Sequence, residues 1–352
     1  MTERRKIVEM WQRDEIVALA TLIRVEGSSY RRAGARLAIG RDGSYVGSVS
    51  GGCLEAEIVR KAQWMVRDGA TVQRYSTLFD DTAEIPYGLG CGGTVDVLIE
   101  PADTPEFNAL MEAFFASLNG ETRAVATWVP AEGKPLARAV LSGTGNGDRR
   151  SSRVESTDGE QPIQEILSPP QRVFIFGAGD DAQPMVRMAA LLGWTVHVLD
   201  SRVQWAKAER FPEARSVQAT SHLHHLSPNA DDAVILMTHS YEKDRSWLEL
   251  LLPREPRYVG LLGSRHRSAL LLAEAAQALG WPLERACERV FSPVGLDLGG
   301  DGAEAVALSA VAELQACLHG KLGHSRRMTP ATIAEQIAQG GASRYLQAQC
   351  AL

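Results

Sequence analysis

The stretch VFIFGAGDDAQPMVRMAALLGWTVHVLD, residues 173–200, decides the fold of the second half of the chain. Its first four residues are apolar and predict a short buried strand. A glycine turn at 177–179 follows, then a helix over 183–192 and a second strand over 195–199. A strand, a glycine turn and a helix in this order are typical of the dinucleotide-binding fingerprint, whose glycines allow a tight turn and a close approach to pyrophosphate. We therefore predict that this stretch begins a Rossmann-like domain.

The alternation of strands and helices continues toward the carboxyl terminus. We expect further strands at 233–237 and 258–261, and helices at 243–252, 266–279 and 302–318. Short strands that alternate with helices favour a doubly wound parallel sheet, which we assign to residues 169–325. Residues 326–352 form a predicted helical tail, because Thr329 is suited to cap a helix and Pro330 to its first position.

The first half of the chain has a different pattern, in which strands come in antiparallel pairs. The dipeptide Asp42-Gly43 is a hairpin signal between two strand candidates at 35–39 and 44–49. The other expected elements are helices at 3–13, 53–68 and 107–118, and strands at 16–23, 94–100, 124–129, 137–141 and 164–167, the strands at 124–129 and 137–141 forming a pair. We predict a mixed α/β domain over residues 1–168.

The segment 142–162 separates the two halves by composition. It contains almost no large apolar residue and is rich in Gly, Ser, Asp and Arg, so it cannot bury a core and is predicted to be a flexible loop or linker. Pro169-Pro170 follows it and marks the expected domain boundary.

Composition narrows the class of protein. The chain has 352 residues, 45% of them hydrophobic, and a net charge of -6, which gives no reason to expect nucleic-acid binding. No run of apolar residues approaches the length of a membrane span, and the amino terminus lacks the unbroken apolar stretch of a signal peptide. We therefore expect a cytoplasmic protein with two domains.

Two of the five cysteines lie in glycine-rich turns. Cys53 follows Ser50-Gly51-Gly52 at the predicted start of a helix, where the helix dipole favours thiolate. Cys91 lies in the loop GLGCGG, which keeps a sulfur accessible. No CxxC pair occurs, so a zinc knuckle and a thioredoxin-like site are not supported. The simpler alternative for both cysteines is a small residue needed for close packing; Cys287 and Cys317 are predicted to be buried, inert thiols and Cys350 a terminal thiol.

Other segments carry groups that suit an anionic ligand. The turn GSSYRRAGAR holds Arg31, Arg32 and Arg36, which can clamp phosphate, although each can equally be a solvated surface residue. The turn Gly263-Ser264-Arg265 follows a predicted strand and is a second candidate phosphate turn. The histidines at 222, 224 and 225 are interpreted as an exposed loop rather than a metal site.

Together these segments resemble the xanthine dehydrogenase accessory factor family, also called XdhC/CoxI. The ordered motifs are GSSYRRAGARLAI at 27–39, VGSVSGGCLEAEI at 46–58, YGLGCGGTVDVLIEP at 87–101, the stretch at 173–202, THSYEKD at 238–244, YVGLLGSR at 258–265 and PVGLDLGG at 293–300. The resemblance implies a cysteine-bearing amino-terminal domain and a Rossmann domain. It also implies an accessory factor rather than a dehydrogenase: members bind molybdenum cofactor, protect it while its terminal sulfur is installed, and assist its insertion into a molybdenum hydroxylase.

The chain departs from the family pattern at three places. Many relatives have Pro at the position of Tyr30 and His at the position of Asp180, and the usual Thr-Pro-Glu-Glu is Gly-Ala-Glu-Ala at 302–305. Whatever role the histidine has in relatives is therefore not carried over to Asp180.

The resemblance and the residues together give a site hypothesis. Cys53 and Cys91 would contact molybdenum or its exchangeable sulfur, the arginines would hold phosphate, and the Gly177 turn would receive a nucleotide portion. The predicted cofactor-binding residues are Cys53, Cys91, Gly51, Gly52, Gly90, Gly92, Arg31, Arg32, Arg36, Gly177, Gly179, Asp200, Gly263, Ser264 and Arg265. The expected ligand is molybdenum cofactor in its molybdopterin or a dinucleotide form, and the expected partners are a hydroxylase of the xanthine dehydrogenase type, a sulfur-donating cysteine desulfurase and a second copy of the chain.

Two alternatives stay open at this point. Gly177, Gly179 and Asp200, whose carboxylate can bind a ribose hydroxyl, also fit an NAD(P)-dependent oxidoreductase. Against it, Asp180 and Asp181 would oppose an anion in the turn, and the cysteine loops would have no role. The other alternative is a thiol-based sensing or interaction protein in which the Rossmann domain is only a scaffold.

Overall fold

The computed structural model describes residues 1–27, 29–52, 54–76, 93–130, 135–142, 162–220 and 227–323. It divides into two compact units: the amino-terminal unit from Glu3 to Pro169, and the carboxyl-terminal unit from Pro170 to the last described residue, Gly323, together with Met1 and Thr2. The predicted linker falls almost entirely, and the predicted tail entirely, outside the described residues.

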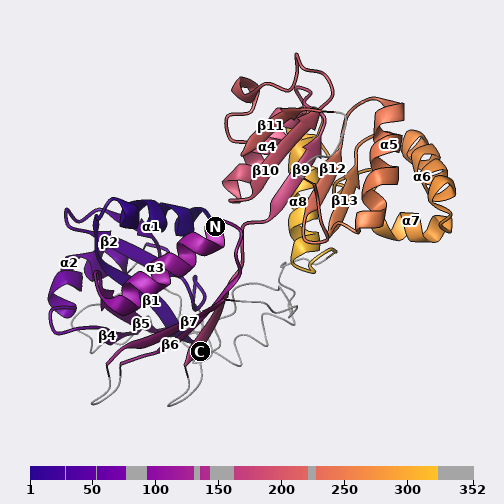
Figure 1. The fold of residues 1–352 in the computed structure, drawn as a ribbon. Coiled ribbons are helices and arrows are strands. Elements are labelled where there is room, and N and C mark those ends of the chain that lie inside the picture. Colours follow the sequence, from indigo (N-terminus) through magenta and orange to yellow (C-terminus); the bar gives the residue numbers. More distant parts are fainter. Residues whose placement is uncertain are drawn as a thin grey trace, which may run out of the picture. The chain divides into compact units, whose positions relative to one another are not determined.

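The carboxyl-terminal unit contains a parallel five-stranded sheet in the order β11-β10-β9-β12-β13 (Figure 1). The strands are β9 (Arg172–Phe176), β10 (Thr195–Asp200), β11 (Ser216–Ala219), β12 (Ala233–Leu236) and β13 (Tyr258–Leu261). The chain starts in the middle at β9, moves outward to β11, and then crosses to β12 on the other side of β9. The predicted doubly wound parallel sheet is confirmed, and its switch in strand order lies between β9 and β12.

Strand β9 shows why both faces of this sheet are covered by helices. Val173 and Ile175 belong to the apolar core on one face, whereas Phe174 and Phe176 belong to the core on the other, as the two-residue period of a strand requires. Helices α4 (Ala182–Leu191) and α8 (Ala303–Leu318) pack on the first face, and α5 (Tyr241–Leu251) and α6 (Arg265–Leu279) on the second. The remaining helical elements are α7 (Leu283–Arg289), η1 (Ala208–Arg210) and η2 (Leu252–Arg254).

The amino-terminal unit is built on an antiparallel five-stranded sheet in the order β3-β2-β1-β5-β4, with a second sheet in the order β7-β6-β8. The strands are β1 (Ile16–Gly27), β2 (Arg36–Gly40), β3 (Tyr45–Gly47), β4 (Thr71–Ser76), β5 (Gly93–Pro101), β6 (Arg123–Trp128), β7 (Ala137–Ser142) and β8 (Ile163–Leu167). The predicted hairpin at Asp42-Gly43 and the predicted pairing of β6 with β7 are confirmed.

Helices cover the larger sheet on both faces. Side chains of α1 (Thr2–Gln12) and α3 (Pro105–Leu118), such as Ile7 and Phe107, share one core with Leu19 of β1. Ile58 of α2 (Glu55–Met65) shares the core on the opposite face with Leu22 of β1. The mixed α/β architecture expected for this part of the chain is confirmed. No helix in the described ranges is both long and apolar enough to cross a membrane.

Candidate functional site

The carboxyl edge of the parallel sheet gathers several of the predicted site residues. Because the strands are parallel, the loops that follow β9, β10, β12 and β13 all emerge at this edge, next to the switch in strand order. Ligands of open α/β sheets bind at this position. Four turns therefore define the candidate site in this unit.

Gly177 is required by the close approach of two strand ends. Its φ is +124°, and a Cβ atom at this position would lie 2.3 Å from the carbonyl oxygen of Met237, directly after β12. Its N–H donates to the carbonyl of Leu199 in β10 at 2.8 Å. The glycine thus allows the turn after β9 to sit against both neighbouring strands.

Asp200, at the end of β10, faces the glycine turn. One carboxylate oxygen accepts hydrogen bonds from the N–H of Ala178 at 2.8 Å and from Arg202 Nη2 at 2.6 Å, and the other accepts from Arg202 N at 2.8 Å and Nε at 2.9 Å. Burial alone would raise the pKa of this carboxyl, but the hydrogen bonds from Arg202 and Ala178 outweigh it and lower the pKa. Both oxygens are thus bound by the protein's own donors.

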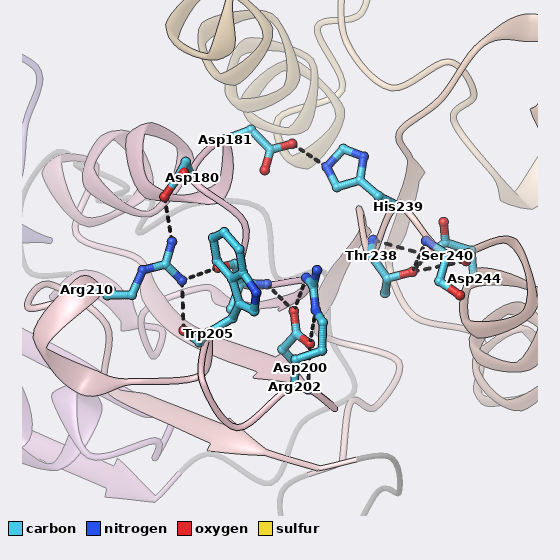
Figure 2. A network of polar contacts seen from close by, with 11 residues as sticks. Asp180, Asp181, Asp200, Arg202, Trp205, Arg210, Thr238, His239, Ser240 and Asp244 are labelled. Carbon is cyan, nitrogen blue, oxygen red and sulfur yellow. Dashed lines mark hydrogen bonds and ion pairs between the residues drawn. The ribbon is translucent and has the colours of Figure 1, made fainter.

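Two arginines surround Trp205 beside the same turn (Figure 2). The guanidinium carbon of Arg210 lies 4.5 Å and that of Arg202 5.3 Å from the Trp205 ring centroid. Arg210 also donates to Asp180 Oδ1 at 2.6 Å and to the carbonyl of Trp205 at 2.9 Å. The positive charges next to the turn are therefore paired with carboxylates of the protein.

An Asp–His pair joins the turn after β9 to the loop after β12. Asp181 Oδ2 lies 2.7 Å from His239 Nε2, and His239 has the left-handed φ of +60°, which is uncommon for a residue with a side chain (Figure 2). The adjacent Thr238 donates its hydroxyl proton to Asp244 Oδ1 at 2.7 Å. The pair therefore links the loops that follow β9 and β12, the two strands between which the strand order switches.

The turn after β13 continues into α6. Ser264 caps this helix, since its hydroxyl accepts the N–H of Arg267 at 3.3 Å. The guanidinium of Arg267 donates to Asp244 Oδ2 at 2.7 Å, and Asp244 is completely buried. The side chain of Arg265 is exposed. Through Thr238 and Arg267, Asp244 therefore connects the loop after β12 with the first residues of α6.

In the amino-terminal unit, the loop before α2 folds around the carboxylate of Glu55, which is 3% exposed. Its oxygens accept the N–H groups of Val49, Ser50, Gly51 and Gly52 at distances from 2.8 to 3.3 Å, and the hydroxyls of Ser48 and Ser50. Gly51 and Gly52 have φ of +91° and +117°, the region that glycine adopts without steric cost.

These donors change the acidity of Glu55. Burial would raise its pKa, but the hydrogen bonds from Ser50 and Ser48 outweigh burial and lower the pKa to about 2. The N–H of Leu54 donates to the Ser50 hydroxyl at 2.8 Å. Both neighbours of Cys53 in the sequence, Gly52 and Leu54, are therefore held by this network.

Two of the three predicted clamp arginines engage different carboxylates of the protein. Arg31 donates to Glu3 at 2.6 Å, and Arg32 is exposed. Arg36 makes a two-pronged ion pair with Glu165 and lies over the Phe114 ring at 4.8 Å, with 11% of its side chain exposed. The structure does not gather these arginines around one ligand position.

Several predicted residues lie outside the described part of the chain, namely Cys53, Cys91, Gly90, Gly92, Cys350 and the histidines at 222, 224 and 225. Cys317 is half-buried, and burial raises the pKa of its thiol. The prediction that Cys287 is buried is wrong: in the short helix α7 the neighbouring Ala286 faces the core and Cys287 is exposed. No cluster of three or more His, Cys, Asp or Glu suited to a metal occurs within the described ranges.

The sequence reasoning missed Trp205, Arg210, His239 and Asp244 as members of the carboxyl-edge network. Trp205 and Arg210 lie between regular strands, where no periodic pattern marks them. His239 and Asp244 belong to the motif THSYEKD, which indicates the family but not the contacts. For Asp244 the available signal was its position, since it is an acidic residue just inside a predicted helix that follows a buried strand.

Comparison with known proteins gives matches in both units. The family described as "XdhC Rossmann domain" matches residues 173–314, and the "XdhC and CoxI family" matches residues 10–76. A Bacillus subtilis protein named as a probable xanthine dehydrogenase subunit is 30% identical over 316 residues, which cover 85% of this chain and 92% of that protein.

Two further relatives extend over most of the chain. The Escherichia coli "Molybdenum cofactor insertion chaperone PaoD" is 26% identical and is aligned over 88% of this chain and 86% of its own. A crystal structure from Bacillus halodurans, described as a xanthine dehydrogenase, has a TM-score of 0.76 and 29% identity, and covers 95% of this chain and 99% of that one.

Proposed function

Because the chain belongs to the XdhC and CoxI family, we propose that it is a molybdenum cofactor maturation factor. It receives the cofactor as cargo and assists its insertion into a molybdenum hydroxylase of the xanthine dehydrogenase type. The observation that carries this proposal is the similarity, across both units, to a relative named as a molybdenum cofactor insertion chaperone.

The geometry of the Gly177 turn supports an accessory factor over an NAD(P)-dependent oxidoreductase. Asp200, the residue expected to bind a ribose hydroxyl, accepts hydrogen bonds from Ala178 and Arg202 on both oxygens. Asp180 and Asp181 add negative charge beside the turn, and negative charge there opposes a pyrophosphate. Nicotinamide dinucleotide binding would require these contacts to rearrange.

The network around Glu55 supports a role for the nearby Cys53. It holds Gly52 and Leu54 on either side of Cys53, at the amino end of α2, where a helix dipole lowers thiol pKa values. We propose that Cys53 and Cys91 contact the molybdenum or its exchangeable sulfur. In this scheme a cysteine desulfurase supplies the sulfur in the cytoplasm, the chain works as a homodimer, and the cargo is the molybdopterin or a dinucleotide form.

The test begins with chain purified without oxygen from cells that make molybdenum cofactor. Mass spectrometry of the released small molecules is expected to show a pterin, and the loaded chain is expected to activate a cofactor-free molybdenum hydroxylase. A released nicotinamide, with no pterin and no activation, would instead establish the oxidoreductase alternative.

The thiol roles are tested with Cys53→Ala, Cys91→Ala and, as matched control, Cys287→Ala, which removes an exposed thiol from α7. We expect the first two variants to lose activation of the hydroxylase and the control to retain it. Full pterin content and full activation in both Cys53→Ala and Cys91→Ala would remove the thiols from the proposal.

A further inference from the structure

Tyr30, which lies between β1 and β2, has an aromatic ring that rests with one face on Gly51. A Cβ atom at Gly51 would lie 2.5 Å from Tyr30 Cδ1 and 3.0 Å from both Cγ and Cε1. Because Cγ and Cε1 are hardly farther away than Cδ1, this position lies over the face of the ring and not beyond its edge. The glycine therefore lets the loop before α2 support the ring from one side.

The opposite face of the Tyr30 ring is open to solvent. Tyr30 is 77% exposed although Gly51 covers one face of its ring. Trp64 of α2, another exposed aromatic residue of this unit, has the guanidinium of Arg67 over its ring at 4.8 Å. Within the described ranges no cation lies over Tyr30 in this way. The ring thus presents an aromatic face on which a flat ligand can stack.

The backbone on both sides of this contact is held by hydrogen bonds. The Gly51 N–H donates to Ser48 Oγ at 2.9 Å. The turn that follows Tyr30 is anchored to β1, since the Gly34 N–H donates to the carbonyl of Leu22 at 2.7 Å. An aromatic face that is held in place before binding has less conformational entropy to lose when a ligand stacks on it.

The glycine after this contact borders open space and precedes Cys53 in the sequence. Gly52 is exposed, and no atom of the described residues lies within 4 Å of the position that its Cβ atom would occupy. Two chain steps of about 3.8 Å separate Gly51 from Cys53. Arg32, exposed in the turn after Tyr30, adds a positive charge. A flat heterocycle on the ring would therefore lie beside the loop that carries Cys53, and an anionic substituent on it would be favoured.

We propose that Tyr30 binds the heterocycle of the cargo by stacking its exposed ring face on a pterin. That the heterocycle is a pterin rests on the proposed function; the stacking position rests on the contact with Gly51 and on the exposure of the ring. Stacking uses the face of the ring and not the hydroxyl, so phenylalanine is expected to replace Tyr30 without loss.

The test adds the full chain, purified from cells that make no molybdenum cofactor, to the fluorescent probe pterin-6-carboxylate and follows fluorescence anisotropy. Wild type and Tyr30→Phe are expected to bind the probe equally, and Tyr30→Ala about tenfold more weakly, since a stacked ring is lost. The matched control is Tyr45→Ala, which removes another exposed tyrosine ring of the same unit, from β3, and is expected to bind as wild type does.

Three results would overturn the stacking role: absence of binding to wild type, equal binding by wild type and Tyr30→Ala, or an equal loss in Tyr45→Ala. A loss in Tyr30→Phe as large as in Tyr30→Ala would overturn it too, because the hydroxyl would then be the binding group. Cytidine monophosphate is titrated in parallel, since its base is also planar. Tighter binding of cytidine monophosphate than of the pterin, lost in Tyr30→Ala, would overturn the pterin as the occupant.

Failure of this proposal can be told apart from failure of the proposed function. If the chain carries a pterin and activates the hydroxylase, but Tyr30→Ala binds the probe as wild type does, only the stacking role is refuted. If the probe binds through Tyr30, but chain from cofactor-producing cells carries no pterin and activates no hydroxylase, the proposed function is refuted and the stacking position is retained.

Discussion

The backbone N–H of Ala178, inside the glycine turn after β9, donates a 2.8 Å hydrogen bond to the carboxylate of Asp200 at the end of β10. In a dinucleotide site, an acidic residue at this position is available to the ribose. Here Asp200 also accepts three hydrogen bonds from Arg202. The contact joins two loops of the carboxyl edge and gives Asp200 a structural role.

Replacing Asp200 with Ala is expected to destabilise the chain by about 2–3 kcal/mol, because the Ala178 N–H and the Arg202 guanidinium lose their shared acceptor. The free energy of unfolding, from denaturant titration, measures this. Asp68→Ala is the control, since the Asp68 side chain is 86% exposed and its ion pair with Arg67 contributes little. Equal stability losses in the two variants would contradict the structural role of Asp200.

Gly177→Ala is expected to be strongly destabilising, by roughly 3 kcal/mol or more, because the added Cβ would meet the Met237 carbonyl as well as strain the backbone. Gly69→Ala separates the two effects. Gly69 has a similar φ of +113° but no atom within 4 Å of the position of a Cβ, so this variant is expected to lose about 1 kcal/mol. Thermal and denaturant unfolding of both variants give the difference, and a difference near zero would mean that the turn relaxes freely.

Glu55 is expected to make the free energy of unfolding depend on pH in the acidic range. Its pKa is about 2 in the folded chain and near 4.5 when unfolded, so the folded state binds fewer protons. Its contribution is complete above about pH 4.5 and is lost as the pH falls toward 2. Glu55→Gln, which cannot ionise, is expected to lower stability at pH 7 and to flatten this part of the pH profile.

The matched control for the Glu55 profile is Glu112→Gln, at an exposed position of α3. Unfolding free energies between about pH 2 and 5 are compared for the three proteins. A Glu55→Gln profile that follows wild type through this range would show that the carboxylate is not held as the structure indicates.

The loop around Glu55 is also expected to control how fast the Cys53 thiol reacts. Because Glu55 binds the N–H of Gly52, Glu55→Gln loosens the backbone next to Cys53 and is expected to change its rate of alkylation. Peptide mapping after timed iodoacetamide treatment measures both Cys53 and Cys287. Only the Cys53 rate is expected to change, since Cys287 belongs to another unit; parallel changes at both would indicate general unfolding instead.

Substitutions of Arg36 and Arg32 are expected to change stability by different amounts, although the sequence makes both arginines candidates for phosphate binding. Arg36→Met leaves the buried carboxylate of Glu165 without its main partner and is expected to cost about 3–5 kcal/mol. Arg32→Ala, at an exposed position, is expected to change stability by less than about 0.5 kcal/mol. Denaturant unfolding compares them, and a mild effect of Arg36→Met would return this arginine to the phosphate hypothesis.

The sequence alone determined the architecture of the carboxyl-terminal unit, because local signals specify it. Runs of apolar residues predicted β9, β12 and β13, and the glycine turn with the following helix predicted the Rossmann arrangement. Burial in a parallel sheet needs continuous apolar strands, and that requirement is visible in a short window.

The tertiary structure decided which partners the charged side chains bind, and therefore which of the predicted site residues remain free for a ligand. Asp200 binds Ala178, Arg36 binds Glu165, and Asp244 binds Arg267, although these partners lie 22, 129 and 23 positions apart. Such pairings depend on which side chains the packed core brings together, and hydrophobic periodicity carries no information about them. The same holds for Ser268, which is an ordinary helix residue in the sequence; packing of α6 against the sheet buries its hydroxyl, which has no hydrogen-bond partner among the described residues.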